Sequence, residues 1–413
     1  MANVVERAVQ FISRQPRNWK VTACGASIDR CVYQMVFPYL SVYIALLGAT
    51  GTQLGAINSA GMVASAVLGL LAGTAVARVG TKKVYSAGVA LVALSYLIIG
   101  LAQNWVLALA GTMLWWCGST AAGYGCAIVC GTSLANRDRA TAMGCCESLT
   151  QGVMGFIGPV IGAMLVAGFG GVSVRGIRPV FFIASIMCLG AWLFVSTQLS
   201  ETECGIGNGG SNPFLLLRDR PDLVRFVAVS CLTSLPTGMV LPFTQVYASQ
   251  VKMADQYVLG TMVTAAAVIG LLLGVPLGRL ADRMGRKRIL FVLAPVYWIG
   301  NLLLVWSSRP ASLVLVGVFQ GAFTMTSMLT QAIAVELAPS ERTSDWLAVT
   351  KFFKMIAVAA MASVSGLIWD HVGPEYVFLL AVAIDAAVRI PLLLGVPETL
   401  ELPGRSGESS VRG

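Results

Sequence analysis

Seven ionisable side chains lie inside long apolar stretches of the sequence, where a charge is costly. They are Asp29, Arg30, Glu147, Lys351, Lys354, Asp385 and Arg389. An ionised side chain at the centre of an apolar helix costs roughly 2.5–3.5 kcal/mol on membrane-insertion scales, so such residues usually face a cavity or a partner. Two kinds of chemistry are open to them: binding a charged solute and carrying a proton.

The first of these groups places an acid beside a base. Adjacent residues of a helix differ by about 100° in direction, so we expect Asp29 and Arg30 to face different neighbours. The face of Arg30 also carries the other candidates for a substrate-binding surface, which are Tyr33, Gln34 and Phe37. Asp29 is the first candidate for proton coupling, and a structural Asp29–Arg30 pair is the alternative.

The remaining charges divide between binding, proton transfer and structure. Lys351 and Lys354 are three residues apart and share a helix face. We expect Lys354 to contact substrate, and Lys351 either to do the same or to extend toward the membrane surface. Glu147 is the second candidate for proton coupling, with a gating role as the alternative. Asp385 and Arg389, four residues apart, predict a structural ion pair.

The apolar stretches are too extensive for a water-soluble protein. The chain has 413 residues, of which 56% are hydrophobic and 11% charged, and its mean hydropathy is +0.78. Soluble domains are about 45–50% apolar and about 25% charged. A bilayer core about 30 Å thick needs roughly 20 apolar residues per helix. The composition therefore predicts an all-α, multi-span membrane protein.

Hydropathy divides the chain into twelve predicted spans. Their limits are 19–47, 52–76, 84–102, 105–134, 142–168, 177–198, 224–249, 256–281, 289–308, 311–337, 344–369 and 374–396. Between the sixth and seventh spans, the Gly-, Asn- and Ser-rich stretch 200–222 predicts a cytoplasmic linker. The expected units are a basic amphipathic segment on the inner membrane face at 1–18, six-helix bundles at 19–199 and 223–397, and a tail at 398–413.

Positive charge sets the predicted orientation of the spans. With both termini inside, the inner segments hold 20 Lys and Arg residues and the outer loops hold 4. This bias predicts a protein of the cytoplasmic (plasma) membrane with both termini in the cytoplasm. The net charge of +9 is thereby explained by topology, and we do not expect nucleic-acid binding.

We expect neither a metal centre nor a cofactor. The ten Cys residues show no metal-ligand spacing with the single His, His371, and nine of them lie in apolar stretches, where we expect them to pack helices. The sequence contains no G-x-x-x-x-G-K-[ST] phosphate loop, so a gradient and not ATP hydrolysis is the expected energy source. The expected partners are a small-molecule substrate, the lipid bilayer and protons. We expect a monomer and no enzymatic activity.

The two predicted bundles are repeats of each other. MVFPYLSVY at 35–43 aligns with MVLPFTQVY at 239–247 at an offset of 204 residues. GTAVARVGTKK at 73–83 aligns with GRLADRMGRKR at 278–288 at an offset of 205. Parallel repeats related by an axis along the membrane normal place a substrate site between the halves, near the membrane midplane.

The stretch at 278–288 resembles the loop signature of the major facilitator superfamily, the twelve-helix secondary transporters. The matching positions are Gly278, Asp282, Arg283, Gly285, Arg286 and Lys287. We expect Gly278 to let two helices approach closely and Gly285 to allow a tight turn. The resemblance implies that this loop is an inner latch that steadies the outward-open state; the alternative is a plain loop with the positive charge typical of the inner side. The resemblance implies two pseudo-symmetric six-helix bundles.

The first-half copy of this signature is weaker. The positions that it keeps are Gly73, Arg78, Gly80 and Lys82. Ala77 stands where the pattern has an acid, and Thr81 stands where it has a base. The latch implied by the resemblance is therefore one-sided and depends on Asp282.

Two other motifs bear on the class of transporter. Gly158, Pro159 and Gly162 resemble the Gly-Pro-x-x-Gly element of exporters and antiporters in the family, with ordinary helix packing as the alternative. Proton–drug antiporters of the family carry an Arg in the fourth span before a Gln-Gly pair. Leu114 and Cys117 occupy the matching places here, which argues against a drug antiporter.

Buried charge and family resemblance together predict a secondary active transporter of a small organic solute. Buried cations outnumber buried acids by four to three, which favours an organic anion slightly. Transport by alternating access is expected, coupled to protons or to solute exchange. Two alternatives stay open: a proton-coupled exporter of amphiphilic drugs, and a non-transporting membrane receptor on the same fold.

Overall fold

The computed structural model describes residues 13–134, 142–143, 145–146, 148–201, 221–307, 309–336 and 343–395, and these form helices and turns with no strand among them. The first group of helices comprises α2 (Arg17–Leu46), α3 (Gly51–Val79), α4 (Thr81–Leu101), α5 (Trp105–Ser133), the π-helical turn η1 (Ser148–Val153), α7 (Met154–Gly168) and α8 (Val174–Gln198). The second group comprises α10 (Pro221–Val240), α11 (Thr244–Gln250), α12 (Gln256–Met284), α13 (Arg286–Trp306), α14 (Pro310–Glu336), α15 (Thr343–His371) and α16 (Pro374–Gly395). The all-α fold predicted from composition is confirmed.

Most of these helices can cross a bilayer. Within the described residues, nine are long and apolar enough to do so: α3, α4, α5, α8, α12, α13, α15, η1 joined to α7, and α10 joined to α11. Helices α2, α14 and α16 occupy the other three predicted spans but do not meet this criterion over their described residues. The chain is a multi-pass integral membrane protein.

Local sequence explains where the helices begin and end. Asn104, Ser173 and Asp255 each accept a hydrogen bond from a backbone N–H in the first turn of the helix that follows. Gly80 and Gly285 end one helix and begin the next with φ of 96° and 95°, a region that favours glycine. The tight turn predicted at Gly285 is therefore confirmed, and Gly80 repeats it.

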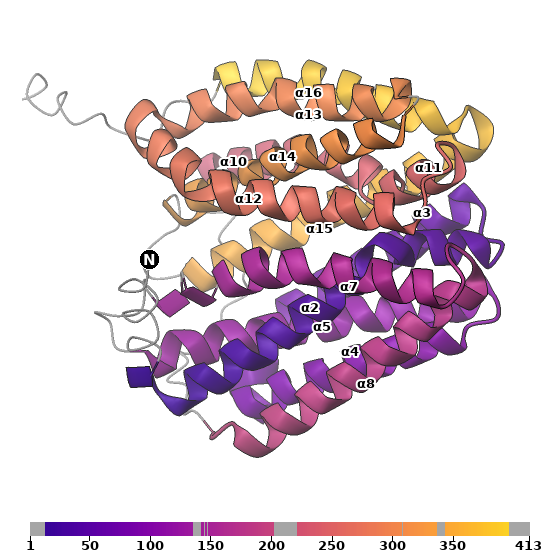
Figure 1. Cartoon of the computed structure of the whole chain (residues 1–413). Coiled ribbons are helices and arrows are strands. Elements are labelled where there is room, and N and C mark those ends of the chain that lie inside the picture. The colour runs from indigo at the N-terminus through magenta and orange to yellow at the C-terminus, as the bar shows by residue number, and fades with distance from the viewer. Residues whose placement is uncertain are drawn as a thin grey trace, which may run out of the picture.

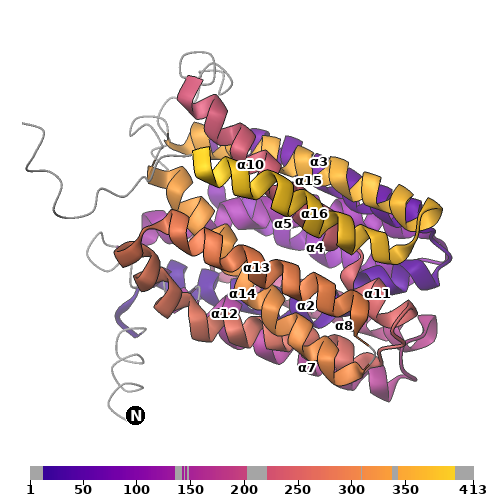
Figure 2. The same cartoon turned by 90° about the horizontal axis from the view of Figure 1, so that it is seen from above.

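The helices run along one common direction and leave their connections at two ends (Figure 1). We call the end that carries Gly80 and Gly285 the motif end, and the opposite end, which carries Thr50 and Asp370, the distal end. In both views α3 lies beside α15 and α7 lies beside α12 (Figures 1 and 2). These two helix pairs join the first group to the second.

Proline divides the seventh predicted span. Helix α10 ends at Val240 and α11 begins at Thr244, with Pro242 in the intervening turn. Pro242 lacks an N–H, so the helical hydrogen-bond ladder is interrupted there. Phe243 and Tyr247, which follow the break, are buried in the main apolar core at the distal end of the molecule.

Candidate functional site

An arginine and a stack of aromatic rings lie together on α2 and α5. The Arg30 guanidinium carbon lies 5.1 Å from the centre of the Tyr33 ring. Tyr33 stacks on Trp115 at 5.2 Å and 15°, and its ring centre lies 5.3 Å from that of Phe37. Trp116 meets Trp115 edge-on at 5.2 Å. We call these five residues the Arg30 cluster.

Helix α4 holds the centre of this cluster in place. The indole N–H of Trp115 donates a hydrogen bond of 2.9 Å to the hydroxyl of Tyr96, which is buried on α4. A buried indole usually needs such a partner, and the bond fixes the plane on which Tyr33 stacks. The stack is therefore preorganised in the structure.

Arg30 has unused hydrogen-bonding capacity. Its Nε is buried and has no hydrogen-bond partner. Leaving a buried donor without a partner costs about 1–3 kcal/mol, and more when the donor is charged. A ligand that accepts a hydrogen bond from the Arg30 Nε would remove this cost. A guanidinium on an aromatic face matches a planar, negatively charged organic group both electrostatically and by stacking.

Asp29 lies beside this cluster but shares no hydrogen bond with it among the described residues. None of the described residues donates a hydrogen bond to its carboxylate, although Arg30 acts on it electrostatically. Asp29 also lies near enough to Tyr96 on α4 and Cys188 on α8 to act on them. The carboxylate therefore faces the interior of the first group, as the one-residue step from Arg30 leads one to expect.

Gln34 lies on another face of α2, away from Tyr33 and Phe37. It is buried against α7, where a Cβ built at Gly158 would meet the Gln34 Cβ at 2.7 Å and one at Gly155 would meet its Nε2 at 3.4 Å. The structure thus brings together three of the four predicted binding residues of α2, and places Gln34 in a helix-packing contact.

Lys351 reaches across to the first group. Its Nζ lies 5.2 Å from the centre of the Tyr124 ring on α5. The two side chains line a pocket between α3, α5 and α15, whose walls also include Ser65, Gly69 and Met355. In this pocket a cation of the second group faces aromatic and hydroxyl groups of the first group.

Lys354 takes a different direction from its neighbour. It is partly buried and interacts electrostatically with Cys231 on α10, inside the second group. A step of three residues along a helix stops about 60° short of a full turn, so the side chains of Lys351 and Lys354 point in different directions. Of the two lysines, the structure brings Lys351 to the contact between the groups.

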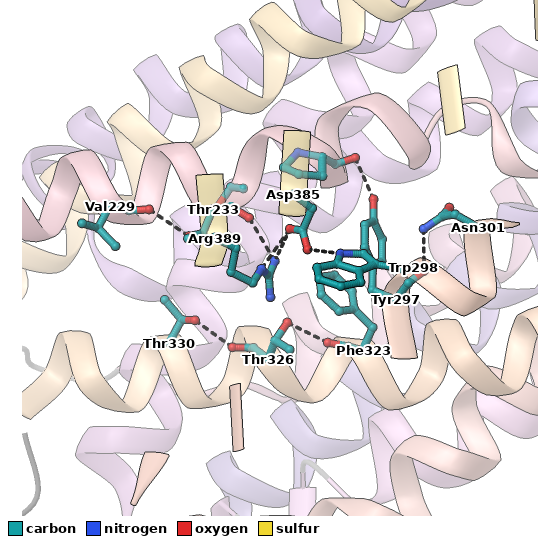
Figure 3. Close-up of polar contacts among 12 residues, drawn as sticks. Val229, Thr233, Tyr297, Trp298, Asn301, Phe323, Thr326, Thr330, Asp385 and Arg389 are labelled. Atoms are coloured by element: carbon teal, nitrogen blue, oxygen red, sulfur yellow. Dashed lines mark hydrogen bonds and ion pairs between the residues drawn. The ribbon is translucent and has the colours of Figure 1, made fainter. Parts of the chain in front are cut away.

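Asp385 and Arg389 form the predicted structural ion pair, shown in Figure 3. Their closest atoms are 2.8 Å apart, and the Trp298 indole donates to the other Asp385 oxygen at 2.8 Å. Arg389 also donates to the carbonyl of Thr233 at 3.3 Å and lies over the Phe323 ring. The network ties α16 to α10, α13 and α14, and both charged groups are buried.

The Gly-Pro-x-x-Gly element lies in the contact between α7 and α2. A Cβ built at Gly158 would lie 2.6 Å from the Cys31 carbonyl oxygen, and one at Gly162 would lie 2.4 Å from the Met35 carbonyl oxygen. Pro159 is buried inside α7. Only glycine permits this approach of two helix backbones.

The loop signature is described only in part. Gly278, Arg283 and Gly285 are described, whereas the side chains of Ala77, Asp282, Arg286 and Lys287 and the surroundings of Gly73 lie outside the described part. Arg78 and Arg283 are exposed at the motif end. No described atom lies within 4 Å of a Cβ built at Gly278, so the close helix approach predicted there is wrong for the described residues. Glu147 also lies outside the described residues.

Two features of the site could not be found from the charged residues alone. Tyr96, which holds Trp115, is one aromatic residue among many in an apolar stretch. Asp370 lies one residue beyond the predicted span 344–369, outside the apolar stretches in which a charged side chain stands out. The sequence pattern that could have drawn attention to Asp370 is the absence of an acidic residue in the first turn of α3, whereas Asp255 directly precedes α12.

Comparison with known proteins identifies the family to which the chain is related. The sequence profile of the Major Facilitator Superfamily matches residues 22–253 and 226–410, which together cover nearly the whole chain. The multidrug resistance protein MdtG of Yersinia enterocolitica serotype O:8 / biotype 1B is 24% identical over 298 residues, which span 68% of this chain and 69% of that protein.

Solved transporter structures share the fold. The nucleoside transporter NupG superposes with a TM-score of 0.75 at 13% identity, covering 92% of this chain and 99% of that one. The human organic anion transporter MFSD10 (TETRAN) superposes with a TM-score of 0.65 at 16% identity, covering 92% and 100%. On the sequence profile and the shared fold, this chain is a transporter that belongs to the major facilitator superfamily.

Proposed function

We propose that the protein is a secondary active transporter of a small organic solute that combines a ring with a negatively charged group. The Arg30 cluster carries this proposal, because a cation with an unpaired buried donor lies on a preorganised aromatic stack. The stack binds the ring of the solute, and Arg30 binds its anionic group.

Lys351 is the proposed second contact, from the opposite group of helices. Its place in the pocket with Tyr124 supports this role, because a solute held by both groups of helices links their relative movement to its own binding. Lys354, which faces Cys231, is proposed as a weaker contributor, and Gln34 as a residue that positions α2 against α7.

Asp29 is the proposed proton-coupling residue. Its carboxylate receives no hydrogen bond from the described residues and lies in the apolar interior of the first group, where proton binding removes the cost of a buried charge. Arg30 is adjacent, so the protonation of Asp29 changes the field at the binding residue. Glu147, outside the described residues, is the alternative coupling residue.

The motif end is proposed to face the cytoplasm, with both termini on that side of the cytoplasmic membrane. The charge bias of 20 inner against 4 outer Lys and Arg residues supports this orientation. In this orientation the distal end faces outward, and the loop signature with Asp282 is a cytoplasmic latch. The units proposed from the sequence are two six-helix bundles joined by a cytoplasmic linker, and the functional unit is a monomer.

Export of amphiphilic drugs is the second candidate function. The name of the Yersinia relative, a multidrug resistance protein, and the aromatic content of the Arg30 cluster favour it. Leu114 opposes it, because the Arg typical of proton–drug antiporters is missing there. Raised drug tolerance in cells that express the protein, lost in Asp29→Asn, is the result that separates this candidate from anion transport.

Ligand-induced thermal stabilisation tests the proposed site. Purified protein is screened against organic anions, matched neutral analogues and cationic drugs, since a ligand at 100 times its Kd stabilises the native state by about 2.7 kcal/mol. We expect aromatic or amphiphilic anions to stabilise the wild type. Arg30→Gln is expected to weaken that binding at least roughly tenfold, while Arg30→Lys, which keeps the charge but loses the planar stack, is intermediate.

Lys354→Gln is the matched control for Lys351→Gln, because the two lysines share a helix but face different groups. We expect Lys351→Gln to weaken anion binding more than Lys354→Gln does. Equal stabilisation of the wild type and Arg30→Gln by every ligand of the panel contradicts the proposed site.

A further inference from the structure

At the distal end of the molecule, a carboxylate of the second group of helices accepts hydrogen bonds from the first group. Asp370, near the end of α15, accepts a hydrogen bond of 2.8 Å from the backbone N–H of Gly51 and one of 2.7 Å from that of Thr52. The Thr52 hydroxyl donates a third bond of 2.6 Å to the same carboxylate. Gly51 and Thr52 are the first two residues of α3.

These bonds satisfy groups that α3 cannot satisfy itself. The first N–H groups of a helix have no partner within the helix, and its N-terminus carries partial positive charge. Thr50 caps only the N–H of Gln53, in a capping box with the Gln53 side chain. Asp370 therefore acts as a cap for α3 that is supplied by the other group of helices.

The position of Asp370 within α15 does not favour an acidic side chain. It lies in the last turn of α15, where the helix dipole is negative and disfavours a carboxylate. The distal N-terminus of α12 provides the contrast, since Asp255 caps the N–H of Val258 in its own helix. Of these two outward-facing helix starts, α3 is the one that takes its acid from across the contact.

Packing around the carboxylate fits the same role. A Cβ built at Gly51 would lie 2.4 Å from Cδ1 of Trp369, so glycine leaves the room in which α15 docks. Trp369 stacks on Phe243 at 5.0 Å, just after the break between α10 and α11. A Cβ built at Gly55 would lie 2.4 Å from the carbonyl oxygen of Ala362. The α3–α15 contact is thus tight directly below Asp370.

Further hydrogen bonds between described residues of the two groups also lie at this end. Besides those of Asp370, there is one from the Tyr39 hydroxyl to the Gln256 carbonyl at 2.8 Å and one from Thr52 to Gly366. At the motif end of α3, the acid of the family loop signature is replaced by Ala77. The helix pair α3–α15 therefore carries an acidic contact at its distal end, while the sequence lacks the corresponding acid at the motif end.

We propose that Asp370 is a distal latch, which caps α3 only while the distal end is closed and so sets the population of the distally open state. Opening that end moves α15 away from α3 and leaves the N–H groups of Gly51 and Thr52 without their partner. The latch rests on the alternating access proposed above, but it does not depend on the solute or on the coupling ion.

The test measures how often the distal end opens. Asn58 lies on the face of α3 that carries Gly51, Gly55 and Met62, two turns below the latch. Asn58→Cys is introduced into a chain whose native cysteines are replaced, and a membrane-impermeant maleimide is added outside intact cells. The rate of modification is proportional to the open population, so a rare state is still measured.

We expect Asp370→Asn to raise the modification rate roughly tenfold, equivalent to about 1.4 kcal/mol. Thr52→Ala, which removes one of the three bonds, is expected to raise it less. Asn104→Ala is the matched control, because it removes a side-chain cap at the same end whose bond, to the N–H of Leu107, lies wholly within the first group. It is expected to leave the rate within twofold of the parent.

The proposal is overturned if Asp370→Asn is modified at the parental rate, or if Asn104→Ala accelerates modification as much as Asp370→Asn does. Labelling of each variant after detergent solubilisation confirms that the introduced thiol is reactive in a folded chain. If no variant reacts from outside while all react in detergent, the proposal of a distal end that faces outward and opens is wrong, and the latch fails with it.

Discussion

Charged residues that are close together in the sequence face different parts of this protein. Arg30 lies on the Tyr33 ring, whereas Asp29 faces α4 and α8. Lys351 contacts Tyr124 across the group boundary, whereas Lys354 faces α10. Helical geometry predicts that neighbours diverge, but it does not predict which of the two faces a cavity, because that depends on how each helix is rotated against its neighbours.

Neutralising Asp29 is expected to separate binding from coupling. Asp29→Asn keeps the size of the side chain but cannot take up or release a proton. We expect ligand binding to be retained within about threefold, because Asn resembles the protonated form of Asp29 and Asp29 shares no hydrogen bond with the Arg30 cluster, and proton-driven accumulation to be lost. Proton flux is measured with a pH-sensitive dye in vesicles. Intact coupling in both Asp29→Asn and Glu147→Gln eliminates the proposed proton roles.

The Asp385–Arg389 pair gives a prediction about stability. Removing one partner of a buried ion pair leaves an uncompensated charge and costs about 3–5 kcal/mol. Asp385→Asn is therefore expected to lower the unfolding free energy in detergent by that amount, and Asp385→Asn combined with Arg389→Gln to lower it by less than the sum of the single changes. Additive losses contradict a coupled pair. Substrate affinity of the surviving folded protein is expected to be unchanged.

At the scale of elements, glycines decide how closely the helices approach. Gly158 and Gly162 bring α7 onto the backbone of α2, the helix that carries Arg30 and Tyr33. The contact between α7 and α2 therefore fixes the rotation of the binding helix. The sequence motif identified these glycines, but the partner helix became clear only from the structure, because a glycine pattern does not specify which backbone it meets.

Alanine substitution tests this contact. Gly162→Ala places a methyl group against the Met35 carbonyl oxygen, and we expect a loss of about 1–3 kcal/mol in stability together with weaker ligand binding. Gly190→Ala, in the interior of α8 with nothing within 4 Å of its added Cβ, is the matched control. It is expected to be neutral or stabilising by up to about 1 kcal/mol. Equal effects of the two substitutions, read from thermal unfolding, contradict the packing role.

At the scale of the whole molecule, the apolar composition and the repeat specified the fold. Periodic apolar stretches predict helices because each must bury its backbone hydrogen bonds in the bilayer, and the loop signature at 278–288 identified the family. Polar contacts between residues far apart in the sequence could not be predicted. Asp370 and Thr52 are 318 residues apart in the sequence, and nothing local marks them as partners.

The same limit applies to the binding site. The charges of α2 and α15 could be singled out because charge is rare in apolar helices. That Arg30 stacks with Tyr33 and Trp115, held in turn by Tyr96, depends on the rotation of three helices. Single-sequence periodicity does not define that rotation when helices are apolar on every side.

Solute flux in reconstituted vesicles tests the central claim most directly. Protein is placed in proteoliposomes without ATP, a pH gradient is imposed, and the uptake of the best-stabilising radiolabelled anion is measured. Our account predicts accumulation that collapses when the gradient is dissipated, that falls at least roughly tenfold in Arg30→Gln, and that is retained in Lys354→Gln. Binding of that anion without any movement across the vesicle membrane, either down a gradient or in exchange for unlabelled solute, would contradict it.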